Sequence, residues 1–166
     1  FILMKNRGFT LVELLLATGI IMLFSAIIFP NFNLGEKNLA LERSSAKLAQ
    51  DLGGAREMAM SARAFAGAPS SFKGAYGMRF ETGFSSYILF ADLNNDQILD
   101  SGEAVETFFM EKGVKISVLS PVSPLIITFT PPDPTVNINS TTTITLTNDN
   151  QSKNIRINKA GLIYVE

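Results

Sequence analysis

One short acidic segment contains most of the side chains that could bind an ion. It runs from residue 92 to residue 103 and reads Asp-Leu-Asn-Asn-Asp-Gln-Ile-Leu-Asp-Ser-Gly-Glu. Oxygen-bearing side chains fall at positions 1, 3, 5, 9 and 12, and the residue at position 7 can offer its carbonyl, which is the ligand order of a calcium loop. The spacing therefore predicts a structural calcium site whose ligands are Asp92, Asn94, Asp96, Ile98, Asp100 and Glu103.

Two features of this segment differ from an EF-hand-type loop. Gln97 takes position 6, where glycine normally permits a sharp turn, and the flanking residues have the pattern of strands rather than helices. A solvated turn rich in Asp and Asn is the other interpretation, because these side chains bond to nearby backbone groups and stabilise turns. The sequence leaves both interpretations open.

A single carboxylate, Glu13, lies within a long apolar segment near the N-terminus. Residues 9–29 include only four polar side chains, which are Thr10, Glu13, Thr18 and Ser25. As a helix, this segment would be about 31 Å long, which matches the roughly 30 Å hydrocarbon core of a bilayer. A carboxylate inside a spanning helix costs about 3 kcal/mol and usually implies a partner. Glu13 is therefore a candidate for charge pairing.

The residues before the apolar segment indicate its orientation. Lys5 and Arg7 predict that this end stays in the cytoplasm and that the C-terminal part is outside. Met4 begins a natural-looking Met-Lys-Asn-Arg-Gly start, so we expect residues 1–3 to be an upstream extension of the reading frame. A secretory signal peptide fits poorly, because Phe24 would occupy the −3 position of a cut after Ala26. A plain single-pass anchor is the other alternative, but it does not explain Glu13.

The residues around Glu13 resemble a known processing motif. Residues 8–15, Gly-Phe-Thr-Leu-Val-Glu-Leu-Leu, resemble the prepilin-type cleavage and methylation motif of type IV pilins and type II secretion pseudopilins. The resemblance implies that residues 1–8 are a leader, that a prepilin peptidase cuts between Gly8 and Phe9, and that the new amine of Phe9 is methylated. It also implies that residues 9–29 anchor the chain in the inner membrane and later polymerise into a filament.

Glu13 has a physical use in that scheme. It lies four residues after Phe9, on the same helical face, so it could compensate the new amine within its own chain. In a filament it could pair with the amine of a neighbouring subunit and so fix the register. The partners that the resemblance implies are the prepilin peptidase/methyltransferase, other pilin or pseudopilin subunits, an inner-membrane assembly platform and membrane lipid.

The helix is expected to continue beyond the membrane. Pro30 and Gly35 predict a bend or loosening between residues 30 and 36. Apolar residues then recur with helical spacing, which predicts an amphipathic continuation over residues 30–66 whose apolar stripe enters a core. The stripe consists of Leu41, Leu48, Leu52, Ala55, Ala59 and Ala62. Gly53 and Gly54 either weaken this helix by about 1 kcal/mol each or let a sheet pack close to it.

From residue 72 the pattern changes to short alternating segments. They predict strands at 76–81, 86–91, 104–110, 114–119, 125–130, 141–147, 154–158 and 162–165, with turn residues between them. We therefore predict an α+β fold, in which a long N-terminal helix, transmembrane and then amphipathic, packs on an antiparallel β-rich domain over residues 72–166. This arrangement resembles the pilin fold, and most of all the minor pseudopilins of the GspH/FimT-like group, through Ala-Arg-Glu-Met-Ala at 55–59 and Gly-Leu-Ile at 161–163.

The composition excludes most catalytic chemistries. The 166 residues include no cysteine and no histidine, which removes thiol nucleophiles, histidine acid–base pairs and the usual zinc ligands. We therefore expect no enzyme. Removing the leader leaves 12 basic and 15 acidic residues, which argues against nucleic-acid binding despite a small basic group of Lys153, Arg156 and Lys159.

Two functions remain open. The first is a structural subunit, a pilin or minor pseudopilin, of a type IV pilus or type II secretion pseudopilus. The alternative is a filament-tip or membrane-anchored binding module, such as an adhesin or a DNA-uptake minor pilin. In both cases we expect the chain in the bacterial inner membrane, with its C-terminus outside, and then in a pilus or pseudopilus.

Overall fold

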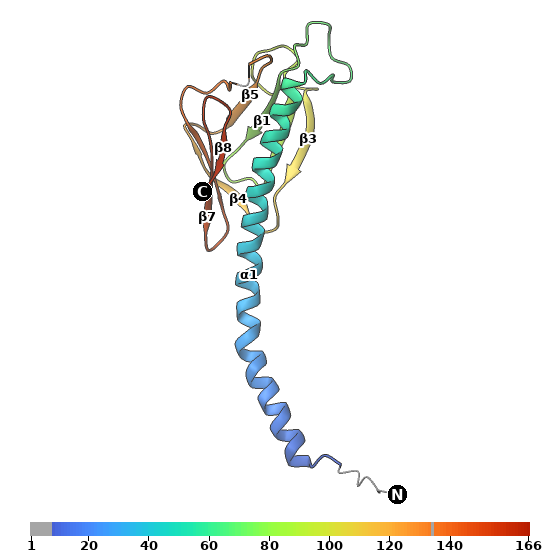
Figure 1. The fold of residues 1–166 in the computed structure, drawn as a ribbon, viewed down its shortest axis with the longest axis vertical. Coiled ribbons are helices and arrows are strands. Elements are labelled where there is room, and N and C mark those ends of the chain that lie inside the picture. Colours follow the sequence, from blue (N-terminus) through green and yellow to red (C-terminus); the bar gives the residue numbers. More distant parts are fainter. Residues whose placement is uncertain (1–7, 134) are drawn as a thin grey trace, which may run out of the picture. The chain divides into compact units, whose positions relative to one another are not determined.

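The computed structural model describes residues 8–133 and 135–166, with only the backbone described for residues 29–34. The predicted leader residues Lys5 and Arg7 lie outside the described residues. The chain forms one long helix followed by antiparallel strands, as the sequence predicted (Figure 1). The elements are α1 (Leu11–Met60), β1 (Tyr76–Phe80), β2 (Ser86–Ala91), β3 (Ala104–Phe109), β4 (Lys115–Ser120), β5 (Leu125–Phe129), β6 (Thr142–Thr147), β7 (Ser152–Ile157) and β8 (Ile163–Val165).

Helix α1 is continuous through Pro30 and Gly35, so the expected loosening between residues 30 and 36 is not observed. A proline removes one hydrogen bond of the helical ladder, while the bonds of the adjoining turns remain available. The chain nevertheless divides into two compact units, Phe1–Glu36 and Lys37–Glu166, and the division falls inside α1. We call the second unit the head and describe each unit by itself.

The helix ends at Met60, whereas the sequence predicted a continuation to residue 66. Two backbone bonds close its end: the Arg63 amide donates to the Met58 carbonyl at 3.0 Å, and the Ala62 amide donates to the Ala59 carbonyl at 2.9 Å. Ala62 has a φ of +45°, so these four residues form a Schellman motif with Ala62 in the position that glycine usually takes. The predicted apolar stripe therefore stops before Ala62, which is exposed.

The strands of the predicted antiparallel domain form two four-stranded sheets. Their strand orders are β3-β2-β1-β5 and β4-β6-β7-β8. The turn at Gly83 and Phe84 joins the two sheets, because the Gly83 amide donates to the Ile116 carbonyl of β4 and the Phe84 carbonyl accepts from the Ile116 amide. The eight predicted strands all exist, and β6 shows the alternating burial that its period-2 sequence predicts.

The core of the head lies between the second half of α1 and the strands. The helix contributes Leu41, Leu48, Leu52, Ala55 and Ala59, all fully buried, as the apolar stripe predicted. Both sheets contribute large side chains to the same cluster, among them Met78, Phe80, Ile127, Phe129, Ile144 and Leu146. Burial of each such side chain contributes about 1.5–3 kcal/mol, so this cluster stabilises the attachment of the sheets to the helix.

The glycines of the helix do not serve close packing. A Cβ atom added at Gly53 or Gly54 would meet no other atom within 4 Å, so the suggestion that they let a sheet approach is wrong. Gly77 of β1 is different, because its Cβ would collide with the ring of Phe90, its cross-strand partner on β2. The ring of Phe90 occupies the space that a side chain at position 77 would need.

We predict that Ala62→Gly stabilises the head by about 1 kcal/mol, because glycine adopts positive φ without the steric cost that a Cβ imposes. Thermal unfolding of the full chain in detergent micelles measures the change. Ala64→Gly, in the exposed segment just after the helix, is the matched control and should give no gain. An Ala62→Gly chain that unfolds at or below the wild-type temperature would contradict the assignment of the Schellman motif.

Candidate functional site

The first turn of α1 forms a capping box around Glu13. The Thr10 hydroxyl accepts a hydrogen bond from the Glu13 amide at 3.2 Å. The Glu13 carboxylate in turn accepts from the Thr10 amide and from the Thr10 hydroxyl, both at 3.3 Å. These reciprocal bonds satisfy amides that the start of a helix otherwise leaves unpaired. The sequence analysis did not predict a role for Thr10, although Thr-x-x-Glu before an apolar segment is a capping-box signature.

The predicted cleavage position lies just before this turn. Gly8, Phe9 and Thr10 belong to no helix or strand, and the Phe9 side chain is 87% exposed. In the uncut chain the Phe9 nitrogen is a peptide amide without charge, so it offers Glu13 no ion pair. Glu13 instead takes Thr10 as its partner and lies at the positive end of the helix dipole.

The apolar surface that follows Glu13 has no protein cover among the described residues. The helix over Leu11–Ile28 is long and apolar enough to cross a membrane, and none of it is buried inside the structure. Leu11, Val12 and Met22 are each about three-quarters exposed. A surface of this size in water would be strongly unfavourable, so lipid or other apolar helices must cover it.

In the head, polar contacts hold the strands on α1 beside the apolar core. Tyr87 of β2 donates a hydrogen bond to the Asp51 carboxylate at 2.6 Å. Burial, the hydrogen bond and the negative charge of Asp51 all raise the pKa of Tyr87. Tyr87 therefore remains a neutral donor at physiological pH. Its ring also packs against Phe80 and Phe108, with centroids 5.6 and 5.4 Å away.

The acidic segment forms the connection between β2 and β3, so strands flank it as the sequence predicted. Its first and last predicted ligands, Asp92 and Glu103, are buried, with exposed fractions of 1% and 3%. Asp92 accepts hydrogen bonds from the amides of Asp96 and Gln97 at 3.1 and 3.0 Å. Glu103 accepts from the amides of Leu93 and Asp100 at 2.8 and 2.9 Å. The two buried carboxylates therefore organise the loop backbone.

Gln97 takes the backbone conformation that position 6 of a calcium loop requires. Its φ is +65°, and that of Asn95 is +61°, so both residues lie in the left-handed region that favours glycine. The departure from glycine in the sequence therefore does not prevent the turn. It adds strain of the order of 1 kcal/mol, which the bonds to Asp92 help to offset.

The predicted ligands in the middle of the loop surround the side-chain nitrogen of Asn94 rather than an open space lined by oxygens. The Asn94 side-chain nitrogen donates to the carboxylates of Asp96 and Asp100 at 2.9 and 3.0 Å, while the Ile98 amide donates to Asp96 at 2.8 Å. Among the described residues, no group of three or more His, Cys, Asp or Glu side chains is arranged to hold a metal ion. Burial raises the pKa of Asp92, which its bonds to the Gln97 and Asp96 amides partly offset. A cation would have to displace the Asn94 amide from between Asp96 and Asp100.

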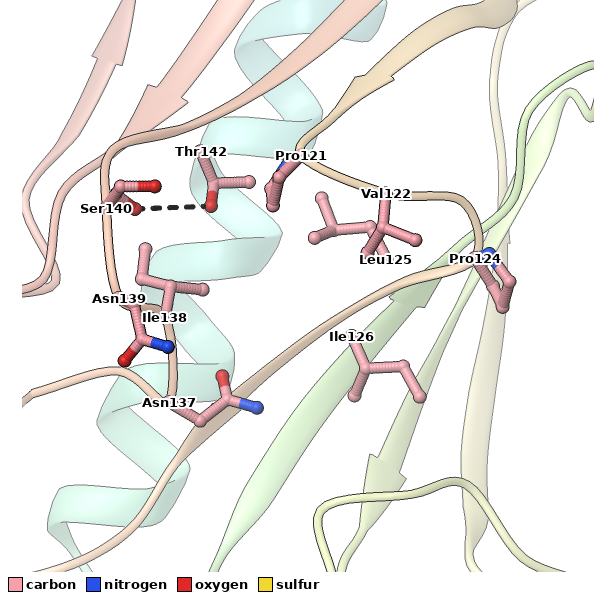
Figure 2. A pocket seen from close by; sticks show the side chains of 10 residues that line it. All are labelled: Pro121, Val122, Pro124, Leu125, Ile126, Asn137, Ile138, Asn139, Ser140 and Thr142. Carbon is pink, nitrogen blue, oxygen red and sulfur yellow. Dashed lines mark hydrogen bonds between the residues drawn. The ribbon is translucent and has the colours of Figure 1, made fainter.

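An uncharged pocket of about 330 Å³ lies between the β4–β5 connection and the segment before β6 (Figure 2). Its apolar wall consists of prolines and branched side chains, and its polar wall of amides and hydroxyls. The lining residues are Pro121, Val122, Pro124, Leu125, Ile126, Asn137, Ile138, Asn139, Ser140 and Thr142. The pocket lining includes no acid or base, so it offers a binding surface rather than a catalytic group.

The predicted basic group near the C-terminus is largely neutralised. Lys153 pairs with Glu42 of α1 at 2.8 Å, and Arg156 pairs with Glu166 at 3.2 Å. The partner carboxylates reduce the local positive charge, which weakens the case for nucleic-acid contact.

We predict that Tyr87→Phe lowers the free energy of unfolding by about 1–3 kcal/mol, because the half-buried Asp51 carboxylate loses its donor while the ring contacts remain. Chemical denaturation of the full chain in micelles measures the loss. Tyr164→Phe on β8, where the side chain is 47% exposed, is the control and should change little. Equal stability of the Tyr87→Phe chain and the wild type would show that this contact does not hold β2 on α1.

Comparison with known proteins gave two family matches. Residues 3–29 match the prokaryotic N-terminal methylation motif. Residues 44–161 match the type II transport protein GspH. No curated protein and no solved structure gave a significant match.

Proposed function

The chain belongs to the family of the type II transport protein GspH, and from this premise we propose that it is a minor pseudopilin that polymerises through α1. The families that match are those of structural subunits. The observation that carries the proposal is the uncovered apolar helix over Leu11–Ile28. Its first turn contains Glu13 in a capping box, and the same helix continues into a packed α+β head.

We propose that processing changes the partner of Glu13. Hydrolysis of the peptide bond between Gly8 and Phe9 by the prepilin peptidase would release residues 1–8 and leave a cationic amine on Phe9. Transfer of a methyl group to that nitrogen from an activated methyl donor would keep the charge. Glu13 lies one turn away and already faces the start of the helix through its bonds to Thr10. It could then pair with this amine in its own chain or with that of a neighbour, and the second pairing would fix the filament register.

The proposed location follows from the same helix. Residues 9–29 would span the bacterial inner membrane, with the head outside, until an assembly platform moves the chain into a pseudopilus. There, the helices of other pilin or pseudopilin subunits would replace lipid on the apolar surface. A type IV pilus is the other assembly that this processing motif serves.

A binding role at a filament tip or as a membrane-anchored adhesin is the second candidate. The uncharged pocket beside β5 favours it, because interface cores are depleted of charged side chains. A DNA-uptake role is disfavoured by the acidic balance of the chain and by the ion pairs of Lys153 and Arg156.

We also propose that the acidic loop, residues 92–103, binds a structural calcium ion. The proposal rests on the ligand order and on the positive φ of Gln97. Asp92, Asn94, Asp96, Asp100, Glu103 and the Ile98 carbonyl would supply the oxygens. The ion would compensate carboxylates whose mutual repulsion otherwise destabilises the loop.

Mass spectrometry of membrane and sheared-filament fractions tests the main proposal. We expect a mature chain that begins with methylated Phe9. Glu13→Gln should be processed normally but enter filaments at least about tenfold less than wild type, because the register charge pair is lost. Glu36→Gln, which removes a carboxylate beyond the span, is the matched control. An intact leader in both fractions would exclude the proposed processing, and normal assembly of Glu13→Gln would exclude the register role.

Calorimetry of the full chain in detergent micelles at millimolar Ca²⁺ tests the ion site. We expect saturable binding that Asp96→Asn and Asp100→Asn each abolish, and that Asp133→Asn, in another turn, leaves unchanged. Because the pKa of Asp92 is raised, its proton competes with the ion at a higher pH than for an ordinary carboxyl. As the pH is lowered, the affinity for Ca²⁺ should therefore begin to fall at a higher pH than it would for a site of ordinary aspartates. No heat of binding at millimolar Ca²⁺ would eliminate the site.

A further inference from the structure

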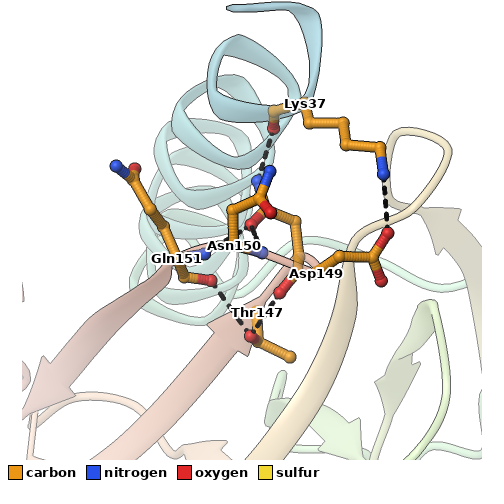
Figure 3. Close-up of polar contacts among 6 residues, drawn as sticks. Lys37, Thr147, Asp149, Asn150 and Gln151 are labelled. Carbon is orange, nitrogen blue, oxygen red and sulfur yellow. Dashed lines mark hydrogen bonds and ion pairs between the residues drawn. The ribbon is translucent and has the colours of Figure 1, made fainter. Parts of the chain in front are cut away.

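The turn between β6 and β7 contacts α1 at the first residue of the head. Asn148 of this turn donates a hydrogen bond from its side-chain nitrogen to the Lys37 carbonyl at 2.7 Å. The Lys37 ammonium pairs with Asp149 of the same turn at 2.7 Å (Figure 3). A helix carbonyl has two lone pairs, so Lys37 accepts from Asn148 without giving up its place in the helical ladder.

Asn148 is almost fully buried, and both the oxygen and the nitrogen of its side-chain amide form hydrogen bonds. Its exposed fraction is 6%. Its side-chain oxygen accepts from the amides of Asn150 and Gln151 at 2.9 and 2.7 Å, which fixes the turn. Its nitrogen faces the helix. One side chain therefore both builds the turn and attaches it to α1.

The ion pair beside it is weaker and exposed. The side chains of Lys37 and Asp149 are 45% and 75% exposed. The hydrogen bond and charge of Lys37 lower the pKa of Asp149. Salt screens exposed pairs of this kind, so the buried Asn148 contact must supply most of the attachment.

The position of this contact coincides with the boundary of the head. The compact unit begins at Lys37, and the other contacts described between α1 and the strands, such as those of Glu42 and Asp51, lie farther along the helix. The first buried apolar residues of α1 in the head are Ala40 and Leu41. Asn148 is thus attached one turn of helix before the core begins.

We propose that the β6–β7 turn is a clamp that sets where α1 becomes rigid with the head, and that the Asn148 amide nitrogen is its main attachment. The clamp confines fraying of the helix to residues before Lys37. Only the role of the clamp in assembly rests on the proposed function: the number of residues between Glu13 and Lys37 would set the length of helix that can move relative to the head when the chain enters a filament.

Hydrogen exchange of the full, unassembled chain in detergent micelles tests the clamp. Asn148→Asp keeps the oxygen that accepts from the turn amides but replaces the donor with an acceptor that repels the Lys37 carbonyl. We expect exchange of the amides at residues 38–41 to rise about fivefold to tenfold, while those at residues 150–151 stay protected. Asn150→Asp, in the same turn, is the matched control and should leave residues 38–41 unchanged.

Two results would overturn the clamp. One is unchanged exchange at residues 38–41 in both Asn148→Asp and Asn148→Ala. The other is a rise of equal size in α1 and in β1–β5, which would show general destabilisation of the head instead. Because the measurement needs no filament, a clamp that holds in a chain that fails to assemble would refute the proposed function alone.

Discussion

The apolar surface of α1 is the constraint on which the rest of the structure depends. Backbone hydrogen bonds and helix propensity alone do not stabilise a helix of 50 residues in water, because most of the stability of a helix comes from packing of its apolar face. The apolar face of α1 must therefore be covered. Within the head, Leu41, Leu48 and Leu52 find that cover in the two sheets. Over Leu11–Ile28 the described residues offer none, and only a membrane or other helices can supply it.

The two halves of α1 accordingly solve different problems with polar groups. In the head, directional hydrogen bonds such as Asp51–Tyr87 and Lys37–Asn148 fix the position of the strands along α1, which apolar packing alone specifies less strictly. In the apolar half, one carboxylate is retained, and Thr10 holds it at the helix start. In the proposed anchor, a charge that is costly in lipid would thereby stay close to the interface until processing supplies the Phe9 amine.

The sequence predicted the elements well where periodicity has a physical cause. Strands such as β6 alternate because one face is buried, and the leucines of α1 recur because one stripe faces the sheets. The end of α1 was predicted wrongly because Ala62 takes a left-handed conformation that its residue type does not announce. The division into two sheets was also not predictable, since it depends on pairing between strands that are distant in the chain.

The acidic loop shows why residue types alone leave a site undecided. The ligand pattern and an Asp/Asn turn require the same residues, and in the structure backbone amides donate hydrogen bonds to Asp92 and Glu103. The difference lies at Asn94, whose amide nitrogen occupies the place between Asp96 and Asp100 that a cation would take. An ion must therefore outcompete two charge-assisted hydrogen bonds. Electrostatic attraction to the four carboxylates of the loop would favour the ion in this competition, because the amide of Asn94 carries no net charge and neutralises none of theirs.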